Sequence, residues 1–320
     1  MLSIAKFNAG GGAAIEAYMQ GEISADKRED YYTSEQKGVW RGGLAEEMGL
    51  SGEIKTGELS NLLNGFDPVT GEKLSINAGA EHAPGWDCTF SAPKSVSLEW
   101  AFADAERRAD IEVAQAKSVE SALAYIEKNA LSNRDRHGPD AGMPAGSLIA
   151  GTYQHGASRE VDPQLHTHCA VANLVQREDG SYGAADLDTR WKMAAGAVYR
   201  AELASEMQKM GYAVERDGSS FRLTAADAKI EAEFSKRAAQ IREQALATGK
   251  TSHLQLMGIA KDSRKNKEFT PDQLKDSWAK AAADMGYTQI ERNADTAQPH
   301  EAMPLPKDFM ALYDLQWIMR

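Results

Sequence analysis

Two strand-like segments joined by a short polar stretch constrain the fold of this chain more than any other feature. Residues 147–155 and 165–176 are predicted strands, and the stretch 156–163 between them contains glycine and proline. This pattern predicts a β-hairpin. Because the predicted strands and helices do not alternate in regular βαβ units, we expect an α+β protein built on an antiparallel sheet.

Hydrophobic periodicity and turn residues locate the remaining elements. A further strand is predicted over 88–91, and a smaller hairpin over 212–223 turns at Asp217-Gly218. Helices are predicted where apolar residues recur along one face. These helices span 13–20, 58–64, 104–130, 187–210, 225–247, 271–285 and 306–318.

Several classes of protein are excluded by the sequence. No apolar run approaches the ~20 residues that span a bilayer, and the N-terminal residues lack the pattern of a secretory signal. Cys88 and Cys169 are the only cysteines. Two cysteines do not make a disulfide framework, so we expect a reducing cytosol.

The overall charge argues against a nucleic-acid partner. The chain has 36 basic and 47 acidic residues, a net charge of −11, whereas phosphate binding requires lysine and arginine. Residues 234–267 are an exception, with eight basic and two acidic residues. Taken alone, this basic stretch is best explained as a solvated helix face.

The segment His166-Thr167-His168 is the strongest local indication of chemistry. Residues two apart in a strand share a face and lie about 6.6 Å apart, so two imidazoles can bind one metal ion. His155 ends the preceding strand and becomes a third ligand if the strands pair antiparallel. Three neutral imidazoles leave a coordination position open, as in catalytic sites. The alternative is a pair of histidines that face solvent.

Aspartate and tyrosine side chains are the next candidates. Asp87 begins a predicted strand, where it would orient a metal-bound histidine or accept a proton from a nucleophile. Tyr18 lies on the first short helix, and Tyr31 and Tyr32 follow. A phenol has a pKa near 10 and is a poor nucleophile unless a cation or a base assists it. Taken alone, all four are explained as ordinary turn, helix and loop side chains.

Together these residues resemble the conjugative relaxases of the MobF (TrwC/TraI-type) group. The specific features are residues 87–97, with the sequence DCTFSAPKSVS, and the spaced histidines; the resemblance covers most of residues 1–260. It implies a palm-like sheet of about five antiparallel strands with helices packed on it, and a helical C-terminal lid.

The resemblance also implies roles for individual residues. His155, His166 and His168 would hold a divalent metal, expected to be Mg²⁺ or Mn²⁺ with Zn²⁺ as the alternative. Tyr18 would cut one strand of plasmid DNA at the origin of transfer and form a 5′-phosphotyrosine bond. Tyr31 or Tyr32 would serve a second strand transfer, and Asp87 would be the acidic residue beside the nucleophile and the metal-bound histidine.

The sequence departs from the family pattern at three points. Tyr18 is followed by Met19 rather than by a second tyrosine, so Tyr18 is the only candidate in the first cluster. The spacer before Tyr31 is long, which leaves the choice between Tyr31 and Tyr32 open. Residues 249–251 lack the preceding glycine of a phosphate-binding loop. We therefore expect either a relaxase fragment or a member without the helicase that usually follows.

The resemblance extends to domains and partners. Residues 1–230 are expected to form the relaxase domain, and 231–320 a helical extension over single-stranded DNA, with one compact domain as the alternative. The implied partners are origin-of-transfer DNA with its inverted repeat, a relaxosome accessory protein and a type IV secretion coupling protein, in the bacterial cytoplasm.

The competing functions are a metal-dependent nuclease that uses water and a replication-initiation or DNA-binding module. DNA contacts are expected from Lys94, Arg159, Arg190, Lys192, Lys261, Arg264 and Lys265.

Overall fold

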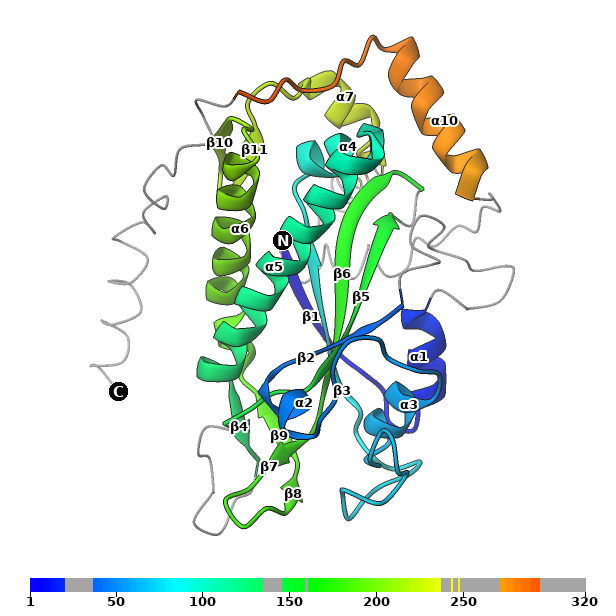
Figure 1. Cartoon of the computed structure of the whole chain (residues 1–320), viewed down its shortest axis with the longest axis vertical. Helices are drawn as coiled ribbons and strands as arrows, with labels where there is room; N and C mark the ends of the chain where they lie inside the picture. The colour runs from blue at the N-terminus through cyan, green and yellow to red at the C-terminus, as the bar shows by residue number, and fades with distance from the viewer. Residues whose placement is uncertain are drawn as a thin grey trace, which may run out of the picture.

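A five-stranded antiparallel sheet forms the centre of the computed structural model (Figure 1). The structure describes residues 1–20, 37–134, 146–158, 161–236, 243, 247 and 271–293. The strand order is β1-β3-β6-β5-β2, and every neighbouring pair is antiparallel. The expected α+β class is therefore confirmed. In sheet order the strands are β1 (Leu2–Lys6), β3 (Gly85–Ser91), β6 (Pro163–Ala172), β5 (Ala150–Ala157) and β2 (Val39–Arg41).

The predicted hairpin is formed by β5 and β6. His155 pairs directly with His166, and Tyr153 pairs with His168, with a register shift between His155 and Ala157. Because side chains alternate across a strand, these four residues share one face of the sheet, whereas Thr167 points to the other. The register therefore gathers the three histidines on a single face.

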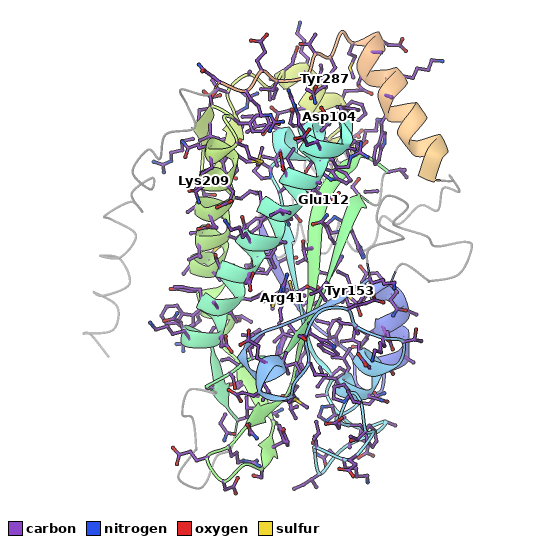
Figure 2. All side chains as sticks on the ribbon, viewed as in Figure 1. Arg41, Asp104, Glu112, Tyr153, Lys209 and Tyr287 are labelled. Atoms are coloured by element: carbon purple, nitrogen blue, oxygen red, sulfur yellow. The ribbon has the colours of Figure 1, made fainter. Side chains whose placement is uncertain are left out.

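Three helices cover the face opposite the histidines. The helix α4 (Lys94–Phe102) follows β3, and α5 (Ala105–Asn129) and α6 (Lys192–Lys209) pack against each other (Figure 1). The main hydrophobic core lies between these helices and the sheet, with Phe90 and Leu123 among its buried residues. Asp104, which is labelled in Figure 2, begins α5 by accepting a hydrogen bond from the backbone of Arg107.

A second, smaller core lies on the histidine-bearing face. It is covered by α1 (Gly12–Met19), α2 (Gly43–Glu47) and α3 (Glu58–Leu63). Tyr153, labelled in Figure 2, and Ala170 belong to this core together with Met19 of α1. Since Ala170 and His168 are two residues apart on β6, the histidines continue the surface on which α1 packs.

Short elements complete the described chain. The hairpin predicted over 212–223 is present as β10 (Val214–Asp217) and β11 (Ser220–Leu223). The helix predicted over 187–210 begins only at Lys192, because Leu187 is the last residue of a strand and a 3-10 turn follows. Asp188 caps this turn by accepting a hydrogen bond from the backbone N–H of Arg190. The other elements are β4 (Leu131–Asn133), β7 (Val175–Gln176), β8 (Tyr182–Gly183), β9 (Ala185–Leu187), η1 (Thr189–Trp191), α7 (Ala228–Glu233) and α10 (Pro271–Asp284).

The described part of the C-terminal region packs on the main core. Phe234, Trp278 and Ile290 are buried in it, and Tyr287 donates a hydrogen bond to the buried Glu99 of α4. The helix predicted over 306–318 lies outside the described residues. The helix predicted over 225–247 is present as the shorter α7, which begins at Ala228 after the Asp227 cap and ends at Glu233; residues 237–242 and 244–246 lie outside the described residues. The division at residue 230 stays a prediction. Among the described helices, none is long and apolar enough to cross a membrane.

Candidate metal and tyrosine site

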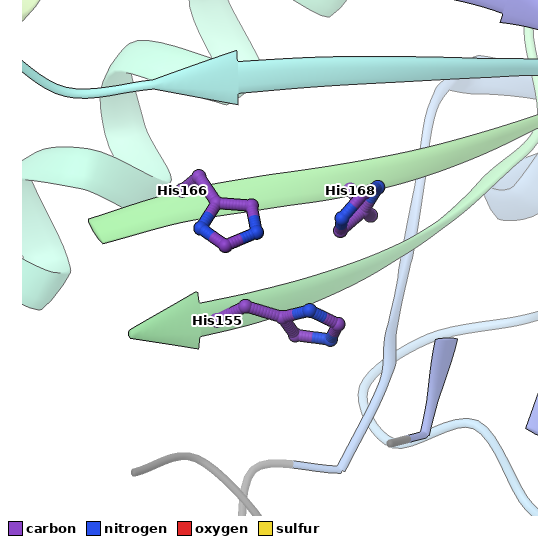
Figure 3. Close-up of side chains that lie close together, drawn as sticks. All are labelled: His155, His166 and His168. Carbon is purple, nitrogen blue, oxygen red and sulfur yellow. The ribbon is translucent and has the colours of Figure 1, made fainter. Parts of the chain in front are cut away.

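The three predicted histidines form one cluster (Figure 3). One ring nitrogen of each lies within 4.8 Å of those of the other two. The ring centroids are separated by 4.9–5.4 Å, and the rings face one another at steep angles. His155 and His168 are buried, and His166 is partly exposed. The arrangement fits a single divalent cation with a position left for another ligand.

Hydrogen bonds fix which nitrogen of each ring is protonated. A backbone carbonyl can only accept, so Nε2 of His155 donates to Met19 O at 3.0 Å and Nδ1 of His166 donates to Gln164 O at 2.8 Å. The second nitrogen of each ring then carries the lone pair that a metal requires.

Asp87 orients the third histidine. Its two carboxylate oxygens lie 2.9 and 3.0 Å from Nδ1 of His168, which donates to them and presents Nε2. The Thr89 hydroxyl oxygen also lies 3.1 Å from Oδ1 of Asp87 and 3.2 Å from Nδ1 of His168. Sequence reasoning missed Thr89, although its position two residues after Asp87 on the strand would have placed it on the same face.

Tyr18 lies against the histidine cluster. Its ring packs edge-on against His168 with a centroid separation of 5.5 Å. The next residue, Met19, accepts the hydrogen bond from His155, so α1 is joined to the cluster by two neighbouring residues. The structure thus brings together Tyr18, Asp87 and the three histidines. Tyr31 and Tyr32 lie outside the described residues.

Three of the predicted DNA-contact residues can be located. The Lys94 ammonium donates to Pro163 O at 2.7 Å, and burial lowers its pKa to about 8. Arg190 forms an exposed ion pair with Asp188, and Lys192 begins α6 on the helix-covered side of the sheet. The remaining four predicted contacts, Arg159, Lys261, Arg264 and Lys265, lie outside the described residues.

The turn between β5 and β6 is held at three consecutive residues. Trp278 of α10 donates to Val161 O at 2.7 Å, the backbone N–H of Lys236 donates to Asp162, and Lys94 donates to Pro163 O. Val161 has a φ of 65°, an unusual conformation for a β-branched residue. Separate helical segments therefore fix the turn of the hairpin that carries the histidines.

Comparisons with known proteins identify the relatives of this chain. The family model described as TrwC relaxase matches residues 12–285. The multifunctional conjugation protein TraI of Escherichia coli strain K12 is 30% identical over 301 residues, which cover 90% of this chain but only 16% of that protein.

Solved structures of the conjugative relaxase TrwC are also similar. Its metal-bound complex with oriT DNA superposes with a TM-score of 0.78 at 32% identity, covering 91% of this chain and 100% of that one. A complex with a 27-mer DNA comprising the recognition hairpin and the cleavage site gives a TM-score of 0.76 at 31% identity, with the same coverage.

The sheet, the histidine cluster and these similarities together place the chain in the class of the relaxases. Within that class, the chain belongs to the TrwC relaxase family. The predicted family and fold are thereby confirmed.

Proposed function

We propose that this chain nicks one DNA strand at an origin of transfer by tyrosine transesterification. The observation that carries the proposal is the contact of the Tyr18 ring with His168, one of three histidines gathered to hold a divalent cation. A phenol becomes an effective nucleophile when a cation or base assists it. The arrangement supplies such a cation site beside the phenol.

The proposed step exchanges one phosphoester bond for another. The Tyr18 oxygen attacks the phosphorus, the bond from phosphorus to the 3′-oxygen breaks, and that oxygen leaves with a proton while the phenolic proton passes to a base. The 5′-phosphate stays on the tyrosine. Because the bonds formed and broken are of similar kind, the reaction is near thermoneutral and reversible. A water nucleophile would instead give irreversible hydrolysis.

The protein's other side chains prepare this step. A cation bound by His155, His166 and His168 would supply Lewis-acid neutralisation of the charge on the scissile phosphate. Two roles are predicted for Asp87, orientation of a metal-bound histidine and proton abstraction. The contacts of its carboxylate with His168 favour orientation. Imidazole ligands suit transition-metal ions such as Zn²⁺ better than Mg²⁺, which prefers oxygen ligands. We propose a divalent cation at this site, with Mn²⁺ as the first ion to test and Zn²⁺ tested in parallel.

The partners follow from the family. TrwC has been solved with oriT DNA, and we infer that this chain binds the corresponding single strand and adjacent inverted repeat of its own origin. Tyr31 or Tyr32 would serve a second transfer. A relaxosome accessory protein, a type IV secretion coupling protein and a cytoplasmic location complete the proposal. Despite the net charge of −11, binding should weaken steeply with salt, because phosphate contacts release counterions.

A covalent adduct provides the test. The protein is incubated with Mn²⁺ and a random pool of single-stranded DNA. DNA that stays attached in detergent is amplified, reselected and sequenced to obtain a specific substrate. We expect an adduct that forms with wild-type protein and is lost in Tyr18→Phe. Cleavage that persists in Tyr18→Phe would favour a water-using nuclease, and binding without cleavage at any metal would favour a non-catalytic module.

A further inference from the structure

Glu16 is a buried carboxylate on α1 that accepts one hydrogen bond from Gln20 at the end of the same helix, at 3.3 Å, and two from the backbone of another helix. Its side chain is 6% exposed. The backbone N–H of Gly57 donates to Oε1 at 2.8 Å, and that of Ser60 donates to Oε2 at 3.2 Å. Both N–H groups belong to the start of α3. Glu16 therefore joins α1 to α3 through two charge-assisted hydrogen bonds.

The start of α3 has no side-chain cap of its own. Its first flanking residue is Gly57, which has no side chain and adopts a φ of 86°. The first N–H groups of a helix have no partner within the helix, and a carboxylate is well suited to accept from them. Glu16 on α1 supplies this acceptor, so its hydrogen bonds hold α1 against the N-terminus of α3.

Tyr18 lies on the other side of the same helix. Residues two apart in an α-helix differ by about 200° in direction, so Glu16 and Tyr18 project to nearly opposite sides. Glu16 accordingly reaches α3 while the Tyr18 ring reaches His168. The beginning of α1 is also close-packed, because a Cβ atom on Gly12 would lie 2.5 Å from the side chain of Asn64 after α3. The helix that carries the tyrosine is thus located chiefly by α3.

We propose that Glu16 is a positioning residue that sets the distance and angle of the Tyr18 phenol relative to the histidine cluster. This proposal rests on the proposed role of Tyr18 as nucleophile. Glu16 does not touch the reacting atoms; it acts by holding α1. Nucleophilic attack requires reacting atoms in near-contact alignment, and a displacement of about 1 Å can lower the rate by about 100-fold.

The test compares Glu16→Ala with a matched carboxylate elsewhere. Glu127 of α5 also accepts two backbone hydrogen bonds, from Gly43 and Leu148, and neither donor belongs to α1. We expect Glu16→Ala to lower the single-turnover rate of adduct formation about 10–100-fold. Its affinities for Mn²⁺ and for the selected DNA should stay within about twofold of wild type. Glu16→Gln, which keeps one acceptor oxygen, should give an intermediate rate, and Glu127→Ala should cleave at the wild-type rate.

A second measurement reports the position of Tyr18 without any cleavage. The protein is labelled with 3-fluorotyrosine, and the Tyr18 ¹⁹F resonance is assigned by its loss in Tyr18→Phe. Glu16→Ala should shift or broaden that resonance, and Glu127→Ala should leave it unchanged.

The two proposals fail in different ways. If wild-type protein forms no adduct, the proposed function is refuted, while the ¹⁹F spectrum still tests the role of Glu16. If wild-type protein forms the adduct and Glu16→Ala cleaves at the same rate with an unmoved Tyr18 resonance, the positioning role is refuted. Equal losses of rate in Glu16→Ala and Glu127→Ala would show a general loss of stability and would also overturn it.

Discussion

Replacing Asp87 with alanine is expected to weaken metal binding at the histidine cluster without unfolding the protein. Both carboxylate oxygens accept from Nδ1 of His168, and this contact holds the ring so that Nε2 faces the cluster. Loss of such a partner typically lowers metal affinity about 10–100-fold. That range corresponds to about 1.4–2.8 kcal/mol, at about 1.4 kcal/mol per tenfold.

Isothermal titration with Mn²⁺ measures this effect directly. Thr89→Val is the graded control, because the Thr89 hydroxyl contacts both Asp87 and His168 but carries no charge. Its loss of affinity should be smaller than that of Asp87→Ala. A metal-free melting curve close to wild type would show that the fold is retained. Wild-type Mn²⁺ affinity in Asp87→Ala, with binding lost in His168→Ala, would refute the orienting role.

Three further outcomes can be checked on the same protein. A Mn²⁺ concentration 100 times the dissociation constant should raise the free energy of unfolding by about 2.7 kcal/mol, and His166→Ala should lose this gain in a thermal melt. Tyr199→Phe should cost about 1–3 kcal/mol in denaturant unfolding, because the Tyr199 hydroxyl donates to Oε1 of the buried Gln115, and that oxygen would lose this hydrogen bond; an unchanged midpoint would contradict this. Burial lowers the pKa of Lys94 from 10.5 to about 8, so the unfolded chain binds this proton more tightly. Wild-type stability should therefore rise relative to Lys94→Met between pH 8 and 10.5, and a constant difference would count against that burial.

The features predicted correctly from the sequence are those with local patterns. The helix α5 has buried Ile111, Val119 and Leu123 at helical spacing, and its observed ends at Ala105 and Asn129 lie within one residue of the prediction. The β5–β6 hairpin was predictable because its two strands are neighbours in the chain. The histidine cluster follows from that pairing, since His155 and His166 face each other across it.

The features that escaped prediction depend on distant partners or on short segments. The strands β1 and β2 are five and three residues long, and they pair with β3 and β5 far along the chain. The helix α4 follows Pro93, where the proline and a run of serine and valine made an extended segment equally plausible. Glu16 gave no local indication either, because its acceptor role depends on α3.

The order of strands has a consequence for how the protein assembles. The strand β6 lies between two pairs, β1 with β3 and β5 with β2, and among the described strands it is the one that joins them. An isolated pair of strands is at best marginally stable in water, so each of the two pairs depends on its contact with β6. That same strand carries His166 and His168. The β5–β6 hairpin by itself brings the three histidines together, and the pairing of β6 with β3 sets Asp87 beside His168. The contact that joins the two halves of the sheet therefore also completes the orientation of the cation-binding centre.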